Sequence, residues 1–138
     1  MKRKNPVSLD IKEILRRLLH MRLPRFDAVV GIGRGGIVPA ALVAAKLGCD
    51  IRILRVSYRD AENRPRYKEP VSAKTPDIPR RIKRILIVDD VSVSGKTLGE
   101  AARIMKGRYL KTMVFKGDAD YVLFPEIRKC VQWPWKEK

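Results

Sequence analysis

The sequence predicts an α/β protein with an open, mostly parallel, twisted sheet that carries helices on both faces. Three observations predict this fold: short apolar segments typical of buried strands, helical patterns between them, and glycine-rich or hydroxyl-rich turns where a strand passes into a helix. After a first helix, the predicted order is strand, helix, strand, long loop, strand, helix, strand, strand. Sheets built in this way bind ligands at the carboxyl ends of their strands.

Residues 8–22 are the predicted first helix, which Ser8 is placed to cap and Pro24 to end. Its apolar residues recur at the helical spacing i, i+3, i+4, i+7: Ile11, Ile14, Leu15 and Leu18. His20 is the only histidine. It has no candidate partner in its neighbourhood, and we interpret it as structural or solvent-facing rather than catalytic.

Residues 27–32 are predicted to form a buried strand, followed by a turn from Gly33 to Gly36 and an apolar helix that Gly48 ends. The turn fits the G-x-G-x-x-G fingerprint of dinucleotide-binding domains. That fingerprint needs an acid at the end of the next strand, and the strand over residues 51–57 ends in Arg-Val-Ser. A dinucleotide-binding domain is therefore disfavoured.

Residues 58–81 are the longest stretch without a clear period. They contain four prolines and many charged residues. A loop of this length inside a compact domain is usually functional or mobile. A solvated basic loop is the alternative interpretation.

Residues 84–98 carry the main functional signal. The apolar residues 85–88 are short and β-branched enough to be a strand buried on both faces, and two acids follow it, Asp89 and Asp90. A turn of small and hydroxylated residues, 92–97, then leads into a helix. The carboxylates can accept hydrogen bonds from sugar hydroxyls or hold a divalent cation. The turn offers N–H groups, hydroxyls and a helix dipole to a phosphate, so the combination suits a sugar phosphate.

Two simpler interpretations apply to the same stretch. The P-loop pattern requires glycine where Asp90 stands, and a carboxylate there would repel the phosphates of a nucleoside triphosphate. Thr97 to Glu100 also fit a capping box, which would only start a helix. Capping does not explain two acids at the end of a buried strand, where unpaired charge is costly.

The remaining elements are simple. The helical stripe of Leu98, Ala101, Ala102 and Met105 is predicted to end at Gly107. Residues 110–116 are predicted to form a fourth strand and residues 120–124 a shorter fifth.

The apolar strand, the two acids and the turn ending in Ser-Gly-Lys-Thr resemble the signature of the type I phosphoribosyltransferases. Over nearly the whole chain, though loosely outside the two loops, the sequence is most similar to the bacterial and archaeal xanthine-guanine (6-oxopurine) enzymes. The resemblance implies one phosphoribosyltransferase domain over residues 1–138, with a flexible flap over the active site at about 58–81 and a base-side tail at about 117–138. It also implies transfer of 5-phosphoribosyl from 5-phosphoribosyl 1-diphosphate to a nucleobase, with Mg²⁺ as cofactor.

The resemblance also implies the site residues. Asp89 and Asp90 would hold the ribose and the metal, and with Arg34 they are the implied catalytic residues. The implied contacts of the ribose and its phosphate are Asp89, Asp90, Val91, Ser92, Val93, Ser94, Gly95, Lys96 and Thr97. Those of the diphosphate are Gly33, Arg34, Gly35, Gly36 and Arg64, with a cis peptide bond expected at Gly33–Arg34. Those of the base are Lys116, Val131 and Trp133.

Two departures from the 6-oxopurine pattern concern the base. Val93 stands where those enzymes usually carry an Asp that acts in proton transfer at purine N7, and Cys130 stands where an aromatic residue stacks on the purine. These departures keep a second hypothesis open. In it, the protein retains the sugar-diphosphate site without efficient transfer and serves as a binding or regulatory protein for RNA or a protein partner.

Composition limits the possible settings. There are 31 Lys and Arg residues against 15 Asp and Glu residues, a net charge of +16 that attracts polyanions. Only 7% of residues are aromatic, without the basic-aromatic alternation of a single-strand-binding surface, so we attribute the charge to solvated surface and substrate attraction and do not favour a nucleic-acid partner. Two cysteines are too few for a disulfide framework, and neither a membrane-spanning run nor a secretory signal is visible. We expect a cytoplasmic homo-oligomer without a membrane partner.

Overall fold

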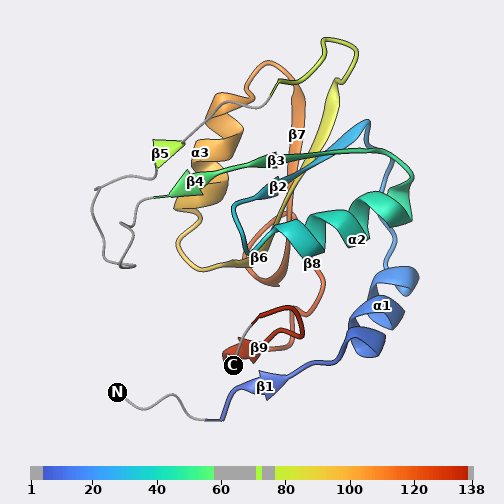
Figure 1. Ribbon diagram of the computed structural model, residues 1–138, viewed down its shortest axis with the longest axis vertical. Coiled ribbons are helices and arrows are strands. Elements are labelled where there is room, and N and C mark those ends of the chain that lie inside the picture. Colours follow the sequence, from blue (N-terminus) through green and yellow to red (C-terminus); the bar gives the residue numbers. More distant parts are fainter. Residues whose placement is uncertain (1–4, 58–70, 73–76, 137–138) are drawn as a thin grey trace.

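A parallel sheet forms the centre of the computed structural model, which describes residues 5–57, 71–72 and 77–136. Its five strands are arranged in the order β3-β2-β6-β7-β8, and each neighbouring pair is parallel (Figure 1). The strands are β2 (Ala28–Ile32), β3 (Asp50–Leu54), β6 (Arg84–Ser92), β7 (Tyr109–Gly117) and β8 (Tyr121–Val122). The predicted sheet is confirmed.

Within the described residues, three helices cover the sheet and two small strand pairs lie beside it (Figure 1). The helices are α1 (Ile11–His20), α2 (Ile37–Leu47) and α3 (Lys96–Ile104). Near the N-terminus β1 (Val7–Ser8) pairs in parallel with β9 (Val131–Gln132), and β4 (Val56–Ser57) pairs antiparallel with β5 (Val71–Ser72). The first of these pairs holds the C-terminal tail against the start of the chain.

Strand β6 is buried on both faces because its side chains alternate between two cores. Leu86 and Val88 join the core that contains residues of α1 and α2, whereas Ile85 and Ile87 join the core that contains residues of α3. All four are 0% exposed. Burial of one such side chain contributes about 1.5–3 kcal/mol, so this strand is fixed from both sides and the residues at its carboxyl end are held with it.

Two helix starts differ from the prediction. The cap of α1 is Asp10, whose Oδ1 accepts a hydrogen bond from the backbone N–H of Glu13 at 2.8 Å, while Ser8 belongs to β1. Helix α3 begins one residue before Thr97 and follows Gly95, which is left-handed and offers no side chain, so the capping box of the alternative interpretation does not form. Gly48 ends α2 in the left-handed conformation, as predicted.

Most of the predicted flap, including Arg64, lies outside the described residues. Within the described part of the chain, no helix combines the length and apolar character needed to cross a bilayer.

Candidate functional site

The two acids stand near the carboxyl end of β6, where each side chain is held by the backbone that follows it. The N–H of Asp90 donates to Oδ1 of Asp89 at 2.8 Å, and the N–H of Val91 donates to Oδ1 of Asp90 at 2.7 Å. Asp90 is only 6% exposed. Each carboxylate is therefore held through Oδ1, and its Oδ2 accepts no backbone N–H among the described residues.

Burial shifts the acid chemistry of this pair. Burial, together with the charge of neighbouring Asp90, raises the pKa of Asp89 to about 8. The Asp89 carboxyl therefore resists ionisation, because a charge there is poorly hydrated and faces the charge of Asp90. A cation bound at the two acids would offset both effects.

The glycine-rich loop between β2 and α2 lies directly on these acids. The Gly33 N–H donates to the carbonyl of Leu54 at 2.7 Å, and a Cβ added to Gly35 would lie 2.7 Å from Oδ1 of Asp90. A side chain at position 35 would thus displace the carboxylate, which explains glycine there. Arg34 is exposed at the tip of the loop, and the peptide bond between Gly33 and Arg34 is trans, so the expected cis bond is absent.

The turn after β6 encloses a small hollow of about 160 Å³. Its lining residues come from the end of β6, the turn and the start of α3: Asp89, Val91, Ser92, Val93, Ser94, Gly95, Thr97 and Leu98. The N–H of Lys96 donates to Oγ of Ser94 at 3.3 Å, whereas the next N–H groups of the first turn have no side-chain cap and are available to an anion. A phosphate can be held at this point by backbone donors and hydroxyls next to the acids.

A second hollow of about 320 Å³ adjoins the first, because Ser92 and Val93 line both. Its other lining residues are Lys116, Gly117, Asp118, Pro125, Ile127 and Arg128. Gly117 lets β7 end against the turn: its φ is +116°, and an added Cβ would collide with the carbonyl oxygen of Ser92. This close approach brings Lys116 beside the turn over residues 92–97. The hollow can hold a flat ring next to a sugar bound at the acids.

The other two predicted base contacts lie elsewhere. Val131 belongs to β9, where it pairs with Val7 of β1. Trp133 is 2% exposed, with its ring stacked on Trp135 at 5.3 Å between centroids and edge-on to Phe115 at 6.0 Å. A base could stack on Trp133 only by displacing its neighbours, and we leave it out of the proposed base contacts.

Sequence reasoning did not single out Asp118, Pro125, Ile127 or Arg128, which the fold brings to the second hollow. Only the expectation that the tail from about residue 117 serves the base pointed toward them. Asp118 directly follows β7, and the positions of the other three follow from the path of the chain after β8.

The acidic pair fits a magnesium ion. Mg²⁺ is typically bound by one or two carboxylates together with substrate phosphates and water, and each acid retains an oxygen that no backbone N–H occupies. Oδ2 of Asp90 is buried without a hydrogen-bond partner among the described residues. No group of three or more His, Cys, Asp or Glu side chains suited to a metal occurs in this part of the chain, so a metal here would depend on its substrate for further ligands.

A lysine of the C-terminal tail reaches the same acids. The ammonium nitrogen of Lys136 lies 2.6 Å from Oδ2 of Asp90. Oδ2 of Asp90 has no hydrogen-bond partner among the described residues, so its contact with the Lys136 ammonium is mainly a Coulombic attraction. Lys136 therefore supplies a positive charge at the place where a divalent cation would bind.

Replacing Lys136 by methionine is expected to lower the free energy of unfolding by about 1–2 kcal/mol in EDTA, since Asp90 loses its counter-charge. The effect is moderate because the lysine side chain is 49% exposed. Mg²⁺ should then raise the melting temperature of the variant more than that of the wild type. Thermal unfolding measured with and without Mg²⁺ tests this.

Lys129→Met is the matched control, because Lys129 is an exposed lysine of the same tail. Equal melting temperatures and equal Mg²⁺ responses for the two variants would contradict a role of Lys136 at the acids.

Comparison with known proteins places these features in a family. The family model for the phosphoribosyl transferase domain matches residues 8–124. In sequence, the chain is 32% identical over 96 residues to the transcriptional regulator GfcR of Methanocaldococcus jannaschii. The match covers 70% of this chain and 44% of the relative, so the chain spans less than half the length of that protein.

Solved structures agree over nearly the whole chain. A purine phosphoribosyltransferase from Pyrococcus horikoshii superimposes with a TM-score of 0.79 at 25% identity, covering 96% of this chain and 95% of that one. The xanthine-guanine-hypoxanthine phosphoribosyltransferase of Helicobacter pylori gives the same TM-score at 15% identity, covering 95% and 94%. The second likeness is one of fold alone.

Proposed function

The protein belongs to the family defined by the phosphoribosyl transferase domain, and from this we propose that it transfers 5-phosphoribosyl from 5-phosphoribosyl 1-diphosphate to a nucleobase, a 6-oxopurine, releasing diphosphate. One observation carries the proposal: the glycine loop rests on Asp90 while the phosphate-sized hollow begins at Asp89. Groups suited to a diphosphate, a ribose and a phosphate therefore meet at one edge of the sheet.

Each part of the substrate has proposed partners in this arrangement. Asp89 and Asp90 accept hydrogen bonds from the ribose hydroxyls, and the turn over residues 92–97 holds the 5′-phosphate. The loop over residues 33–36, with Arg34 at its tip, faces the diphosphate. Mg²⁺ held at the acidic pair would neutralise charge on the leaving diphosphate. The protein's contribution is mainly orientation, with cations and backbone donors placed where negative charge develops.

The base is proposed to lie in the second hollow. Lys116 lines it and can donate to an exocyclic oxygen, such as the 6-oxo group of a purine. During transfer the bond from C1′ to the diphosphate oxygen breaks, a bond from C1′ to a ring nitrogen forms, and that nitrogen's proton must leave. Val93, at the border of the two hollows, offers no acceptor for this proton.

A direct assay tests the proposal. The protein is incubated with Mg²⁺, 5-phosphoribosyl 1-diphosphate and one nucleobase at a time, and diphosphate release is measured together with nucleoside monophosphate formation. Release that depends on guanine, xanthine or hypoxanthine supports transfer. Saturable binding of the sugar diphosphate without release for any base would refute it.

That second result would favour a binding or regulatory protein, the other candidate function. Val93 lacks a proton acceptor, Lys136 places a fixed charge on Asp90, and a 32% identical relative is a transcriptional regulator. In this case the sugar diphosphate would be a signal that the domain senses.

A further inference from the structure

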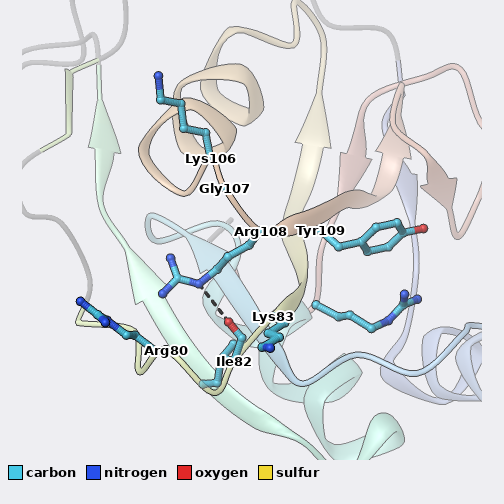
Figure 2. Close-up of a pocket in the computed structure, with 8 residues that line it drawn as sticks. Arg80, Ile82, Lys83, Lys106, Gly107, Arg108 and Tyr109 are labelled. Atoms are coloured by element: carbon cyan, nitrogen blue, oxygen red, sulfur yellow. Dashed lines mark hydrogen bonds between the residues drawn. The ribbon is translucent and has the colours of Figure 1, made fainter.

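We propose that a basic hollow at the opposite end of the sheet binds the phosphate backbone of a double-stranded nucleic acid. The hollow, of about 460 Å³, lies where the chain enters β6 and β7 (Figure 2). Its lining residues are Arg80, Ile82, Lys83, Arg84, Lys106, Gly107, Arg108 and Tyr109. Five of the eight carry a positive charge, and no described acid lines it.

Its position separates this hollow from the acidic site. The hollow is at the amino end of β6, and Asp89 and Asp90 are near the carboxyl end of the same nine-residue strand. Asp89 lies five residues beyond Arg84, which is roughly 17 Å along an extended strand. Phosphates bound at the hollow would therefore not reach the substrate site, and the charge here needs an explanation other than attraction of the sugar diphosphate.

Arg108 gives the hollow a fixed cation. Its Nε donates to the carbonyl of Ile82 at 2.9 Å and its Nη2 to the carbonyl of Ile78 at 3.0 Å. The side chain is half-buried, and both partners are neutral. A guanidinium anchored in this way keeps its full charge and further N–H groups for an external anion, and it loses little side-chain entropy on binding.

The other cations also lack acidic partners within the described residues. None of Arg80, Lys83 and Lys106 forms an ion pair with another described side chain. Arg84 stacks over the ring of Tyr109 at 4.2 Å. Asp27, whose carboxylate contacts this segment, accepts hydrogen bonds from the backbone N–H groups of Lys83 and Arg84, each at 2.9 Å. These cations repel one another, and binding of a polyanion would reduce that repulsion.

The spread of the charges favours a polymer over a single phosphate group. Figure 2 shows Arg80 and Lys106 at opposite margins of the hollow, with the guanidinium of Arg108 between them. A lone phosphate would need cations that converge on one point, whereas successive phosphates of a backbone need cations that stand apart. Tyr109, the one aromatic lining residue, is already covered by Arg84, so the site lacks a stacking platform for unpaired bases and suits a duplex.

The test is the binding of a fluorescent duplex of arbitrary sequence by the full-length protein, measured by anisotropy over a series of salt concentrations. Arg80→Glu/Lys106→Glu removes two exposed cations of the hollow and leaves Arg108 in place. Lys12→Glu/Arg22→Glu makes the same change of charge at two exposed positions in and just after α1. The matched pair separates a local site from the field of the net charge.

Loss of two phosphate contacts is expected to weaken duplex binding by more than about tenfold and to lower the slope of log K against log salt by about 2. The control variant should keep the wild-type slope. Arg80→Gln/Lys106→Gln should show an intermediate loss of affinity. Both Glu variants should bind 5-phosphoribosyl 1-diphosphate as the wild type does, so this result is independent of transfer activity.

Three results would overturn the proposal. Equal losses in the two Glu variants would assign binding to net charge alone. Full competition by inorganic diphosphate at concentrations comparable to the duplex would make the hollow a small-anion site. Tighter binding of a single strand than of the duplex would contradict the inferred class of ligand.

Discussion

An Asp89→Asn variant is expected to be more stable than the wild-type protein above pH 8 and to bind 5-phosphoribosyl 1-diphosphate more weakly. Burial and the adjacent charge of Asp90 raise the pKa of Asp89 to about 8 from an ordinary 3.8. Asparagine resembles the protonated acid and carries no charge that must be buried. The substitution removes the electrostatic cost of burying this charge. It also removes a carboxylate that the proposed ligand requires.

The pH dependence has a definite sign. Below pH 3.8 both the folded and the unfolded protein hold the Asp89 proton, and no stability is lost. As the pH rises from 3.8 to about 8, the unfolded chain ionises first and the folded protein loses stability. The advantage of the asparagine variant should therefore be near zero at the acidic end, grow across this window, and reach a few kcal/mol above it.

Urea denaturation in EDTA at several pH values measures this difference. Asp77→Asn serves as control, because Asp77 is exposed and lies outside the hollows. Calorimetry in the presence of Mg²⁺ should show sugar-diphosphate binding weakened roughly tenfold to a hundredfold, the scale of one lost charge-assisted hydrogen bond. A variant that is less stable than wild type at high pH would show instead that Lys136 and the backbone stabilise the ionised pair.

The strands of this fold were predictable because their signal is local. Residues 85–88 are apolar, mostly β-branched and flanked by charge, and such a run has few alternatives to a doubly buried strand. Helix starts were less predictable. Ser8 and Asp10 are both good caps, and the choice depends on β1, which forms only because Val131 returns to pair with Val7. A pairing between the two ends of the chain leaves no local trace.

The residues of the candidate site also differ in whether a local sequence signal places them. The acids and the glycine loop sit directly after buried strands, so their position follows from the strands. The base side depends on where the tail runs. Trp133 and Trp135 are two residues apart, and their rings stack on each other in the core. The aromatic character of Trp133 would suit a base or a core, and only packing decides between them. Nothing local in the sequence pointed to Arg128, which the fold brings to the second hollow.

Replacing Val93 by aspartate is expected to raise kcat/KM for a 6-oxopurine, by about tenfold to a hundredfold. Val93 borders both hollows and its side chain is 91% exposed, so the change leaves the core intact. A carboxylate at this border would stand between the proposed sugar and base sites and could take the proton that leaves the purine nitrogen. General base catalysis contributes typically about 10²–10⁴-fold, and the expected gain is set below that range to allow for imperfect placement. Diphosphate release with hypoxanthine, guanine and xanthine measures the effect.

Val93→Asn separates proton transfer from polarity, because it has the shape of aspartate without a basic oxygen. If the carboxylate acts as a base, only the aspartate variant gains activity, and the gain should appear as the pH rises above about 4, the ordinary pKa of an aspartate. Equal activity of the two variants would place the limit elsewhere, in base binding or in the charge of Lys136 on Asp90. The double variant Val93→Asp/Lys136→Met distinguishes these, since a gain found only in that background identifies the lysine as the remaining obstacle.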